Sequence, residues 1–489
     1  MFEFEKKRIF LKSIGHIWST IRAGKTCPPP LHWLRVALVS AATILCLLVL
    51  EQYQGASAAE SPTTQGPSKA EVVLDLTQRL SIGGSRTLRR DAYINIHGTP
   101  GELSQDEEQY LLGTLRAGMG RSMGTITSFM RELSEDPQRP GFADPQLLEK
   151  RANQFAARQQ ATLQGRQRDL EIIHSVHPYS YFGKAEGHGD DEDFFVPGSF
   201  EAAAEILASF FSKLDVSQEP YFEVANECNV HVRKLGTNMT EFSDLHSTVA
   251  RKLHKEVPGL KIGGPASAWP AFEFKNFDIW REQMGLFIDR AGKDMDFLSV
   301  HLYTTHWDNQ VNDRFGANID AILDLMENKS LLSTGEVKPL LISECGTGLR
   351  TGEKIMEEYS PHRDWLILQG ANHVLLNLLR RDDRIIKTIP FIVLKASWYD
   401  KQDGKWVLTH LAKWFEFWKD VQGFHLPTSC SSLDVQTHAL LDGNTVYLCL
   451  DNLLATDVEL SVQELIEQDQ QISSASVSRL FFDGTQPVL

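Results

Sequence analysis

A short, mostly apolar run that ends in a glutamate occurs twice in this chain, and it constrains the fold more than any other feature. The first run is Tyr221–Glu227 (Tyr-Phe-Glu-Val-Ala-Asn-Glu), and the second is Pro339–Glu344 (Pro-Leu-Leu-Ile-Ser-Glu). Strands that helices cover on both faces are apolar along most of their length, whereas half-exposed strands alternate between apolar and polar residues. Each run therefore predicts a buried parallel strand with a carboxylate at its C-terminal tip.

Around these two runs, short apolar segments alternate with amphipathic segments, which is typical of βα units. The predicted strands are residues 92–98, 119–127, 170–177, 221–226, 260–264, 295–303, 339–344 and 385–394. The predicted helices are residues 102–117, 146–163, 200–214, 241–256, 277–291, 319–327 and 361–380. Eight strands in about 300 residues predict an α/β fold, a (β/α)8 TIM barrel whose active site lies at the C-terminal ends of its strands.

In a barrel of this kind, Glu227 ends strand four and Glu344 ends strand seven, so both carboxylates reach one cleft. Glycoside hydrolysis uses such a pair, because one protonated carboxyl releases the leaving oxygen and one ionised carboxylate attacks the sugar. A single glutamate at a strand end is more often part of a surface ion pair. Two at these tips, the first preceded by Asn226, favour the catalytic interpretation.

The pattern changes at about residue 424, where short strands joined by turns replace the βα units. The predicted strands here are residues 435–441, 445–451, 458–462 and 475–482, and residues 72–80 could add one more. We expect a catalytic barrel over residues 71–423 and an antiparallel β-sandwich over residues 424–489. About 65 residues is short beside the roughly 100 of an immunoglobulin-type sandwich, so the second domain is expected to be partial.

The N-terminal sequence is typical of a targeting segment. Seven Lys and Arg residues precede or border an uncharged apolar run over Val36–Leu50, and Ala56-Ser57-Ala58 resembles a cleavage site. The run is long for a signal peptide and short for a spanning helix of about 20 residues. Residues 1–58 are therefore expected to be a signal peptide or an N-terminal membrane anchor, followed by a linker over residues 59–70. Either interpretation predicts a secreted, periplasmic or cell-surface protein, in contact with a membrane only through this segment.

Composition excludes several classes of function. The formal net charge of −15 argues against non-specific binding of nucleic acid, and a sulfated ligand would need local basic groups. The six cysteines show no metal-ligand spacing, and the histidines lack an H-E-x-x-H or similar motif, so neither a metal nor another cofactor is expected.

Four segments together resemble glycoside hydrolase family 86, the β-agarases and β-porphyranases of clan A. These segments are Tyr93–Gly98, Tyr221–Glu227, Phe297–Tyr303 and Leu341–Glu344, and the resemblance runs from about residue 71 to the C-terminus. It implies a retaining endo-glycosidase that cleaves β-1,4 linkages of an agar- or porphyran-type red-algal galactan. Glu227 would be the acid/base and Glu344 the nucleophile. Clan members commonly have proline where this chain has Cys228, a difference that we expect to have little effect on the chemistry.

Ten further residues are candidates for binding the polysaccharide. They are Asn226, His97, Arg121, His177, Trp269, His301, Tyr303, His306, Trp307 and Trp398. The resemblance implies that Asn226 bonds a sugar hydroxyl, and Tyr303 could hold the nucleophile in place. Neutral imidazoles can both donate to and accept from hydroxyls, and tryptophan rings can stack on sugars. Arg121 could meet a substrate oxygen or a sulfate, with a surface ion pair as the alternative.

Three other functions are compatible with the sequence. Another clan A retaining glycanase would act on a plant β-glycan, and a catalytically silent surface protein would only bind carbohydrate. A metal-dependent hydrolase would use the histidines predicted near the strand tips.

Overall fold

The computed structural model describes about three-quarters of the chain. The described residues are 8–11, 68–98, 103–164, 171–177, 197–217, 220–232, 235–268, 270, 272, 275–307, 310–351, 354–355, 359–392, 400–402, 405–467 and 471–489. Most of the predicted targeting segment and linker lies outside these ranges, as do Trp269 and Trp398. Among the helices that are described, none has the length and apolar character needed to cross a bilayer.

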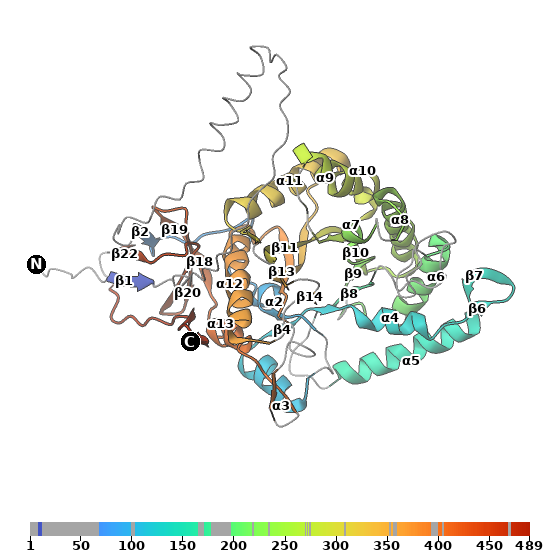
Figure 1. The fold of residues 1–489 in the computed structure, drawn as a ribbon, viewed down its shortest axis with the longest axis horizontal. Helices are drawn as coiled ribbons and strands as arrows, with labels where there is room; N and C mark the ends of the chain where they lie inside the picture. The colour runs from blue at the N-terminus through green and yellow to red at the C-terminus, as the bar shows by residue number, and fades with distance from the viewer. Residues whose placement is uncertain are drawn as a thin grey trace, which may run out of the picture.

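Eight parallel strand positions surround the barrel axis (Figure 1). They are β3 (Asn95–Ile96), β4 (Gly118–Met119) continued by β5 (Arg121–Ser122), β8 (Ile173–Ser175), β9 (Tyr221–Glu223), β10 (Lys261–Ser267), β11 (Phe297–Trp307), β13 (Leu340–Thr351) and β15 (Ile385–Pro390). Neighbouring strands pair in parallel from β5 to β15, and β3 pairs with β4. The ring closes where the amide of His97 donates to the carbonyl of Ile392 at 3.2 Å. The predicted (β/α)8 barrel is therefore confirmed.

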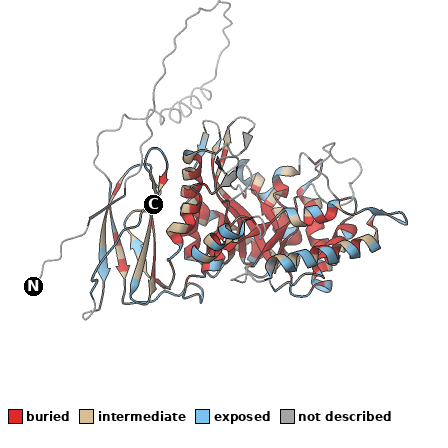
Figure 2. Ribbon diagram, turned by 90° about the horizontal axis from the view of Figure 1, so that it is seen from below, coloured by how far each residue is buried: buried red, intermediate tan, exposed pale blue. Residues whose placement is uncertain are grey.

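Helices surround the barrel. They are α2 (Arg90–Tyr93), α3 (Gln105–Glu108), α4 (Gly124–Arg131), α5 (Pro145–Leu163), α6 (Phe200–Phe211), α7 (Cys228–His231), α8 (Met239–Glu256), α9 (Asp278–Trp280), α10 (Leu286–Ala291), α11 (Ala317–Thr334), α12 (Pro361–Leu378) and α13 (Ala412–Trp418). Side chains accept backbone N–H groups at several of their N-termini, for example Asp144 at α5 and Ser199 at α6. Figure 2 shows the buried residues concentrated in the barrel and on the helix faces turned toward it.

The predicted second strand, residues 119–127, is wrong in its second half. The strand ends at Ser122, and α4 begins at Gly124. The buried residues of α4 are Ile126, Phe129 and Met130. Their spacing of three and four positions buries one face of a helix, whereas a strand would bury every second residue.

Strands β11 and β13 continue beyond the barrel as a paired ribbon. Their register runs from Leu298 opposite Leu340 to Trp307 opposite Arg350. Two short antiparallel strands flank the ribbon, β12 (Gln310–Asn312) beside β11 and β14 (Lys354–Ile355) beside β13. The ribbon therefore extends the sixth and seventh barrel strands past the mouth of the barrel.

A sheet with the order β18-β20-β21 packs against α12, and a second sheet with the order β1-β22-β2-β19 lies against the first. Their strands are β1 (Arg8–Leu11), β2 (Ser68–Asp75), β18 (Phe424–Leu426), β19 (Thr428–Cys430), β20 (Val435–Asp442), β21 (Thr445–Asn452) and β22 (Val458–Leu465). The segment before the barrel does add a strand, because β2 pairs with β22 and β19. The division at residues 423 and 424 remains a prediction.

The predicted last strand, residues 475–482, is wrong except at its end. Only β23 (Phe481–Phe482) forms, paired with β24 (Pro487–Val488). Residues 475–478 are Ala-Ser-Val-Ser, and all four are exposed. Without a neighbouring strand, their backbone groups bond to water instead of to a ladder.

Small β-pairs complete the described structure. Strands β6 (Glu135–Asp136) and β7 (Arg139–Ala143) pair after α4, and β16 (Asp400–Gln402) pairs with β17 (Lys405–Val407) before α13. The predicted helices at 102–117 and 277–291 are each divided into shorter helices and a π-helical segment, Gln109–Thr114 and Arg281–Gly285 respectively.

A buried histidine in this scaffold makes folding stability depend on pH. His246 on α8 bonds through Nδ1 to the carbonyl of Phe242 at 2.6 Å and packs edge-on against Phe287. Its Nε2 has no hydrogen-bond partner among the described residues. Burial lowers the pKa of His246 from 6.5 to about 4, because the interior disfavours the charged imidazole.

The unfolded chain protonates His246 near pH 6.5 and the folded chain only near pH 4, so its contribution to stability is lost as the pH falls between these values. We expect the free energy of unfolding to drop by about 3 kcal/mol over this window. Urea unfolding at both pH values measures the drop, and the variant His246→Leu should show a smaller one. An equal drop in the two proteins would contradict the assignment.

Candidate active site

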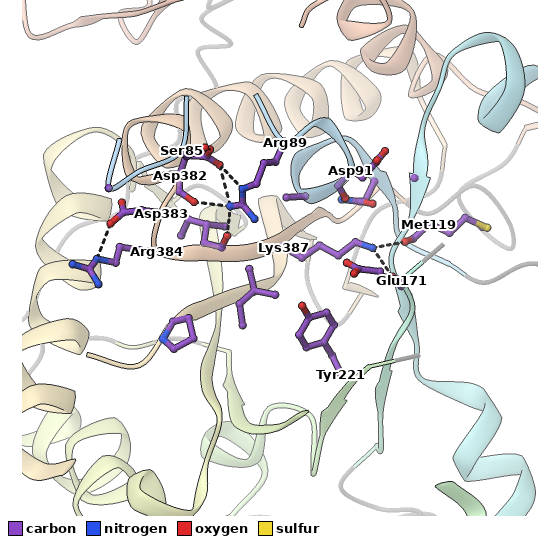
Figure 3. A pocket seen from close by; sticks show the side chains of 17 residues that line it. Ser85, Arg89, Asp91, Met119, Glu171, Tyr221, Asp382, Asp383, Arg384 and Lys387 are labelled. Atoms are coloured by element: carbon purple, nitrogen blue, oxygen red, sulfur yellow. Dashed lines mark hydrogen bonds and ion pairs between the residues drawn. The ribbon is translucent and has the colours of Figure 1, made fainter. Parts of the chain in front are cut away.

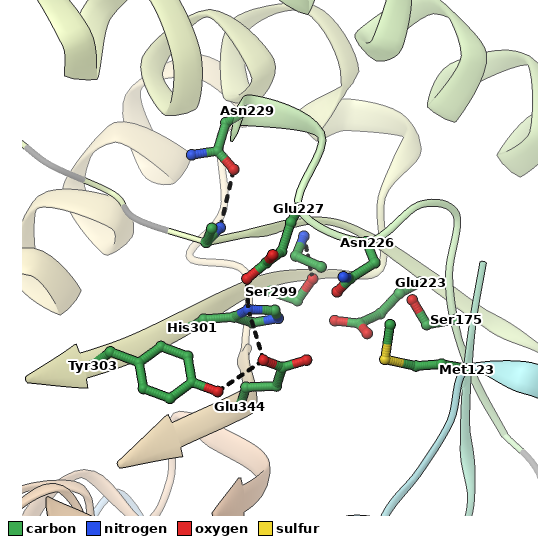
Figure 4. A network of polar contacts seen from close by, with 12 residues as sticks. Met123, Ser175, Glu223, Asn226, Glu227, Asn229, Ser299, His301, Tyr303 and Glu344 are labelled. Carbon is green, nitrogen blue, oxygen red and sulfur yellow. Dashed lines mark hydrogen bonds and ion pairs between the residues drawn. The ribbon is translucent and has the colours of Figure 1, made fainter. Parts of the chain in front are cut away.

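Glu227, four residues beyond the end of β9, and Glu344, within β13, meet over the mouth of the barrel (Figure 4). One carboxylate oxygen from each, together with a ring nitrogen of His301, all lie within 4.8 Å of one another. Retaining glycosidases hold their two carboxyl groups about 5–5.5 Å apart, and inverting enzymes hold them about 6.5–9.5 Å apart to admit a water. These two oxygens lie closer together than the carboxyl groups of an inverting enzyme.

The backbone at Glu227 adopts a left-handed conformation, with φ 50° and ψ 38°. Such a conformation costs a non-glycine residue about 1–3 kcal/mol and persists only where surrounding structure holds it. The amide of Glu227 donates to the carbonyl of Ala266 at 3.0 Å, which ties it to the next strand. Cys228 is fully buried in the core, so the residue that replaces the usual proline points away from the cleft.

Arg121 connects the second strand to both catalytic strands. Its Nη1 donates to Glu344, its Nε donates to Glu223 at 2.8 Å, and its Nη2 donates to the Asn226 amide oxygen at 2.7 Å. The guanidinium side chain has no exposed surface. Arg121 was predicted to meet a substrate oxygen or a sulfate, or to form a surface ion pair. The structure shows instead a buried ion pair that positions Glu344 and Asn226.

Two residues of β11 hold the carboxylates from the other side. His301 Nδ1 lies 2.8 Å from Glu227 and 3.3 Å from Glu344, and the side chain is fully buried. The Tyr303 hydroxyl donates to Glu344 Oε2 at 2.8 Å, the role predicted for it. Burial and then the negative charge of Glu344 raise the pKa of Tyr303 well above 10, so its hydroxyl keeps the proton that it donates.

Glu344 is held in its ionised form. Burial alone would raise the pKa of its carboxyl, because the interior disfavours a charge. The charges of His301, His97 and Arg121 outweigh that effect and lower the pKa below the ordinary value for glutamate. A carboxylate that stays ionised at neutral pH is what a nucleophile requires.

The remaining predicted residues lie at different distances from this centre. His97 Nε2 is 3.7 Å from Glu344, and His177 is half-buried near the same charges. Burial, followed by the positive charges of His231 and Arg121, lowers the pKa of His177 to about 4, so its imidazole is neutral at physiological pH. His306 and Trp307 lie farther away, at the outer end of the ribbon. Their position on β11 separates them from the carboxylates.

The same three groups are the only described cluster whose ligand atoms could hold a metal ion. In that case Glu227, His301 and Glu344 would each supply one ligand atom. Arg121 already brings a positive charge to Glu344, which opposes the approach of a cation. Sensitivity to a chelator distinguishes the two possibilities.

Sequence reasoning missed one charged residue of the site. Glu223 is completely buried four positions before Glu227, and it accepts hydrogen bonds from Arg121. The sequence signal for Glu223 was a glutamate within an otherwise apolar strand. A carboxylate buried inside a barrel needs a charged or hydrogen-bonding partner. Ser175, which pairs with Glu223 across β8 and β9, also contacts Arg121.

The fold and the carboxylate pair are those of the glycoside hydrolases with a (β/α)8 barrel. No family model matches the sequence. The chain is 29% identical to a funoran endo-β-hydrolase of Wenyingzhuangia aestuarii, over 86% of this chain and 62% of that protein. It is 27% identical to a β-agarase of Pseudoalteromonas atlantica (86% and 91% covered) and 30% identical to β-porphyranase A of Phocaeicola plebeius (78% and 52% covered).

Solved structures agree with these relatives. A family 86 enzyme in complex with neoagarooctaose matches with a TM-score of 0.74 and 27% identity, over 86% of this chain and 75% of that one. A family 86 β-porphyranase from Bacteroides plebeius matches with a TM-score of 0.62 and 26% identity, over 80% and 68%. The resemblance to glycoside hydrolase family 86 that the four motifs predicted is therefore confirmed. The chain spans less than two thirds of the length of two of the three relatives.

Proposed function

We propose that this protein is an endo-acting glycoside hydrolase that cleaves β-1,4 linkages of an agar- or porphyran-type galactan with retention of configuration. The observation that carries the proposal is the approach of Glu227 and Glu344 to within 4.8 Å at the mouth of the barrel. That spacing leaves room for a sugar ring to be attacked directly by one carboxylate, but not for an intervening water.

The contacts of the two carboxylates assign their roles. Glu344 accepts hydrogen bonds from Arg121 and Tyr303, which stabilise an anion, and its side chain is 8% exposed. Glu227 is 25% exposed, and within the described part of the chain its carboxylate contacts the ring of His301. Glu344 is therefore the nucleophile, and Glu227 is the group that exchanges a proton with the leaving oxygen and with water.

Catalysis proceeds in two displacements. A Glu344 oxygen bonds to the anomeric carbon while the glycosidic C–O bond breaks, and Glu227 gives its proton to the departing oxygen. Glu227, now ionised, then takes a proton from water. The water oxygen bonds to the anomeric carbon, and the bond to Glu344 breaks. Asn226, buried beside Glu227 and oriented by Arg121, would bond the sugar hydroxyl next to the reacting carbon.

The substrate class rests on the relatives. Their names are those of enzymes acting on agarose, porphyran and funoran, and one solved neighbour holds neoagarooctaose. The test is incubation with agarose, porphyran, funoran, xylan and cellulose, followed by chromatography of the soluble products. Oligosaccharides from a galactan are expected. Products from xylan or cellulose alone would favour a plant β-glycan as the substrate.

Trp307 is expected to extend the polysaccharide site. It lies on the same side of β11 as Tyr303 by strand alternation, its side chain is 45% exposed, and the Arg350 guanidinium lies 5.7 Å from its ring. Stacking on a sugar ring contributes little to bond breaking. Trp307→Ala should therefore raise KM about tenfold with kcat nearly unchanged. Val311→Ala on neighbouring β12 is the control, since Val311 is also exposed, and equal KM values for both variants would contradict the prediction.

Two rivals are separated by simple measurements. A catalytically silent binding protein would show the same behaviour for wild type and Glu227→Gln in every assay. A metal-dependent hydrolase would lose activity on dialysis against a chelator and regain it with added metal. We expect the first comparison to show a loss in the variant and the chelator to have no effect.

We also propose that the protein is exported through its N-terminal segment. The support is the order of basic residues, uncharged apolar run and small residues in the sequence. Expression of the full chain followed by fractionation and N-terminal sequencing tests this. Recovery of uncleaved protein only in the soluble cytoplasm would contradict it.

A further inference from the structure

Glu223 is a buried carboxylate in the barrel, beneath the catalytic centre, to which nothing above assigns a role in the reaction. It lies on β9, opposite Ser175 of β8 and Gly263 of β10, and it is completely buried. The interior layers of such barrels are filled mainly by branched apolar side chains. A carboxylate there is expensive to bury and stays ionised only with a charged partner.

The charged partner of Glu223 is Arg121. Different nitrogens of the Arg121 guanidinium contact Glu223 and Glu344. Nε and Nη2 both approach Glu223 Oε2, at 2.8 and 2.6 Å. Nη1 is left for Glu344, and Nη2 also reaches the Asn226 oxygen. A guanidinium otherwise tends to grip one carboxylate through two N–H groups. Glu223 occupies the Nε–Nη2 edge of Arg121, and Asn226 accepts from Nη2 on the other edge. Glu344 therefore accepts from Nη1 alone.

The charges of Glu223, Glu344 and Arg121 also indicate that Glu223 affects the reaction. Glu223 and Glu344 carry two negative charges, and Arg121 carries one positive charge, so the three together remain negative by one charge. The transition state of glycoside hydrolysis resembles an oxocarbenium ion, with positive charge on the sugar. Removal of Glu223 would leave a neutral pair below that developing charge. Preorganised charge in a dry site is usually the largest contribution to catalysis.

We propose that Glu223 is a positioning residue: by binding one edge of Arg121, it keeps the guanidinium from fully neutralising Glu344 and places a second negative charge beneath the site. This inference rests on the function proposed above. It assigns Glu223 an effect on the chemical step that it exerts through Arg121, without contact with the polysaccharide.

The test uses the full chain and the galactan that the wild type degrades best. Glu223→Gln keeps the shape and removes the charge, and we expect kcat to fall on the order of 100-fold while KM changes by less than about threefold. Glu223→Asp restores the charge and should recover at least about a tenth of the wild-type kcat. The Arg121→Met/Glu223→Gln double variant should be no slower than Arg121→Met alone, because both changes act through one guanidinium.

The matched control is Asp364→Asn, which removes another buried carboxylate paired with an arginine, Arg363, on the outer helix α12. It should lower the melting temperature and leave kcat unchanged. A Glu223→Gln variant that behaves like this control would overturn the proposal, as would failure of both Glu223 variants to fold while the control folds. The proposal would also be overturned if the losses in kcat of Arg121→Met and Glu223→Gln were additive in the double variant. Wild-type protein inactive on every galactan would instead contradict the proposed function itself.

Discussion

Replacement of Glu344 by alanine is expected to abolish turnover of the polysaccharide, with a loss in kcat on the order of 10⁴-fold or more. No other described side chain lies where it could attack the sugar in its place, since Arg121, Tyr303 and His301 surround Glu344 as donors. Product release measured by reducing-sugar assay gives the loss. Glu205→Ala controls for removal of a carboxylate outside the cleft, because Glu205 pairs with Arg139 on the surface.

Azide or formate should partly restore activity to Glu344→Ala. The alanine leaves a space on the face of the sugar that the carboxylate occupied, and a small anion there bonds to the anomeric carbon as the leaving group departs. One displacement replaces two, so the product has the inverted configuration. NMR of the anomeric proton reports it. A rescued product of retained configuration would contradict the assignment of Glu344 as nucleophile.

Replacement of Glu227 by alanine should lower kcat by a factor that depends on whether the leaving group needs a proton. The sugar oxygen released from a polysaccharide needs a proton, and general acid catalysis contributes about 10²–10⁴-fold, so kcat on the polysaccharide should fall by that factor. A dinitrophenyl glycoside leaves without a proton and should still form the glycosyl-enzyme. Its breakdown, which needs Glu227 as the base, becomes the slow step.

Azide should accelerate that slow step in Glu227→Ala, because an anion attacks without giving up a proton. The product then has retained configuration, since Glu344 has already inverted the centre once. Burst kinetics on the dinitrophenyl glycoside measure the two steps separately. Inverted product from this variant would mean that the two roles are exchanged, and equal losses on both substrates would exclude Glu227 as the acid.

The meeting of Glu227 and Glu344 was predictable because the C-terminal ends of parallel barrel strands lie on one face of the barrel. A residue that follows a buried apolar run lies at the C-terminal face, where all eight strands leave the barrel, so two glutamates in such positions were expected to lie close together. Tyr303 was predictable for the same reason, from its position at the tip of the neighbouring strand. Arg121 was not, because its position alone does not show whether the side chain turns toward solvent or toward Glu223.

Glu223 and α4 show where the local pattern fails. In the sequence, Glu223 is a single charged residue within an apolar run. Only the tertiary structure shows that it pairs with Arg121 on another strand. Residues 119–127 mix apolar and polar residues without a clear period, and their division at Ser122 follows from how Ile126, Phe129 and Met130 pack. Short apolar stretches suit a strand or a helix equally, and neighbours decide between them.

By itself, the sequence determined the barrel, the tips that bear Glu227 and Glu344, and the resemblance to family 86. The periodicity of burial and the ends of apolar runs are local properties, which the order of residues records directly. Only the tertiary structure decided the 4.8 Å approach of the carboxylates, the left-handed backbone at Glu227 and the use of Arg121 as a shared partner. These depend on how β5, β9 and β13 close around one axis, and distances across a closed barrel are set by all of its strands together.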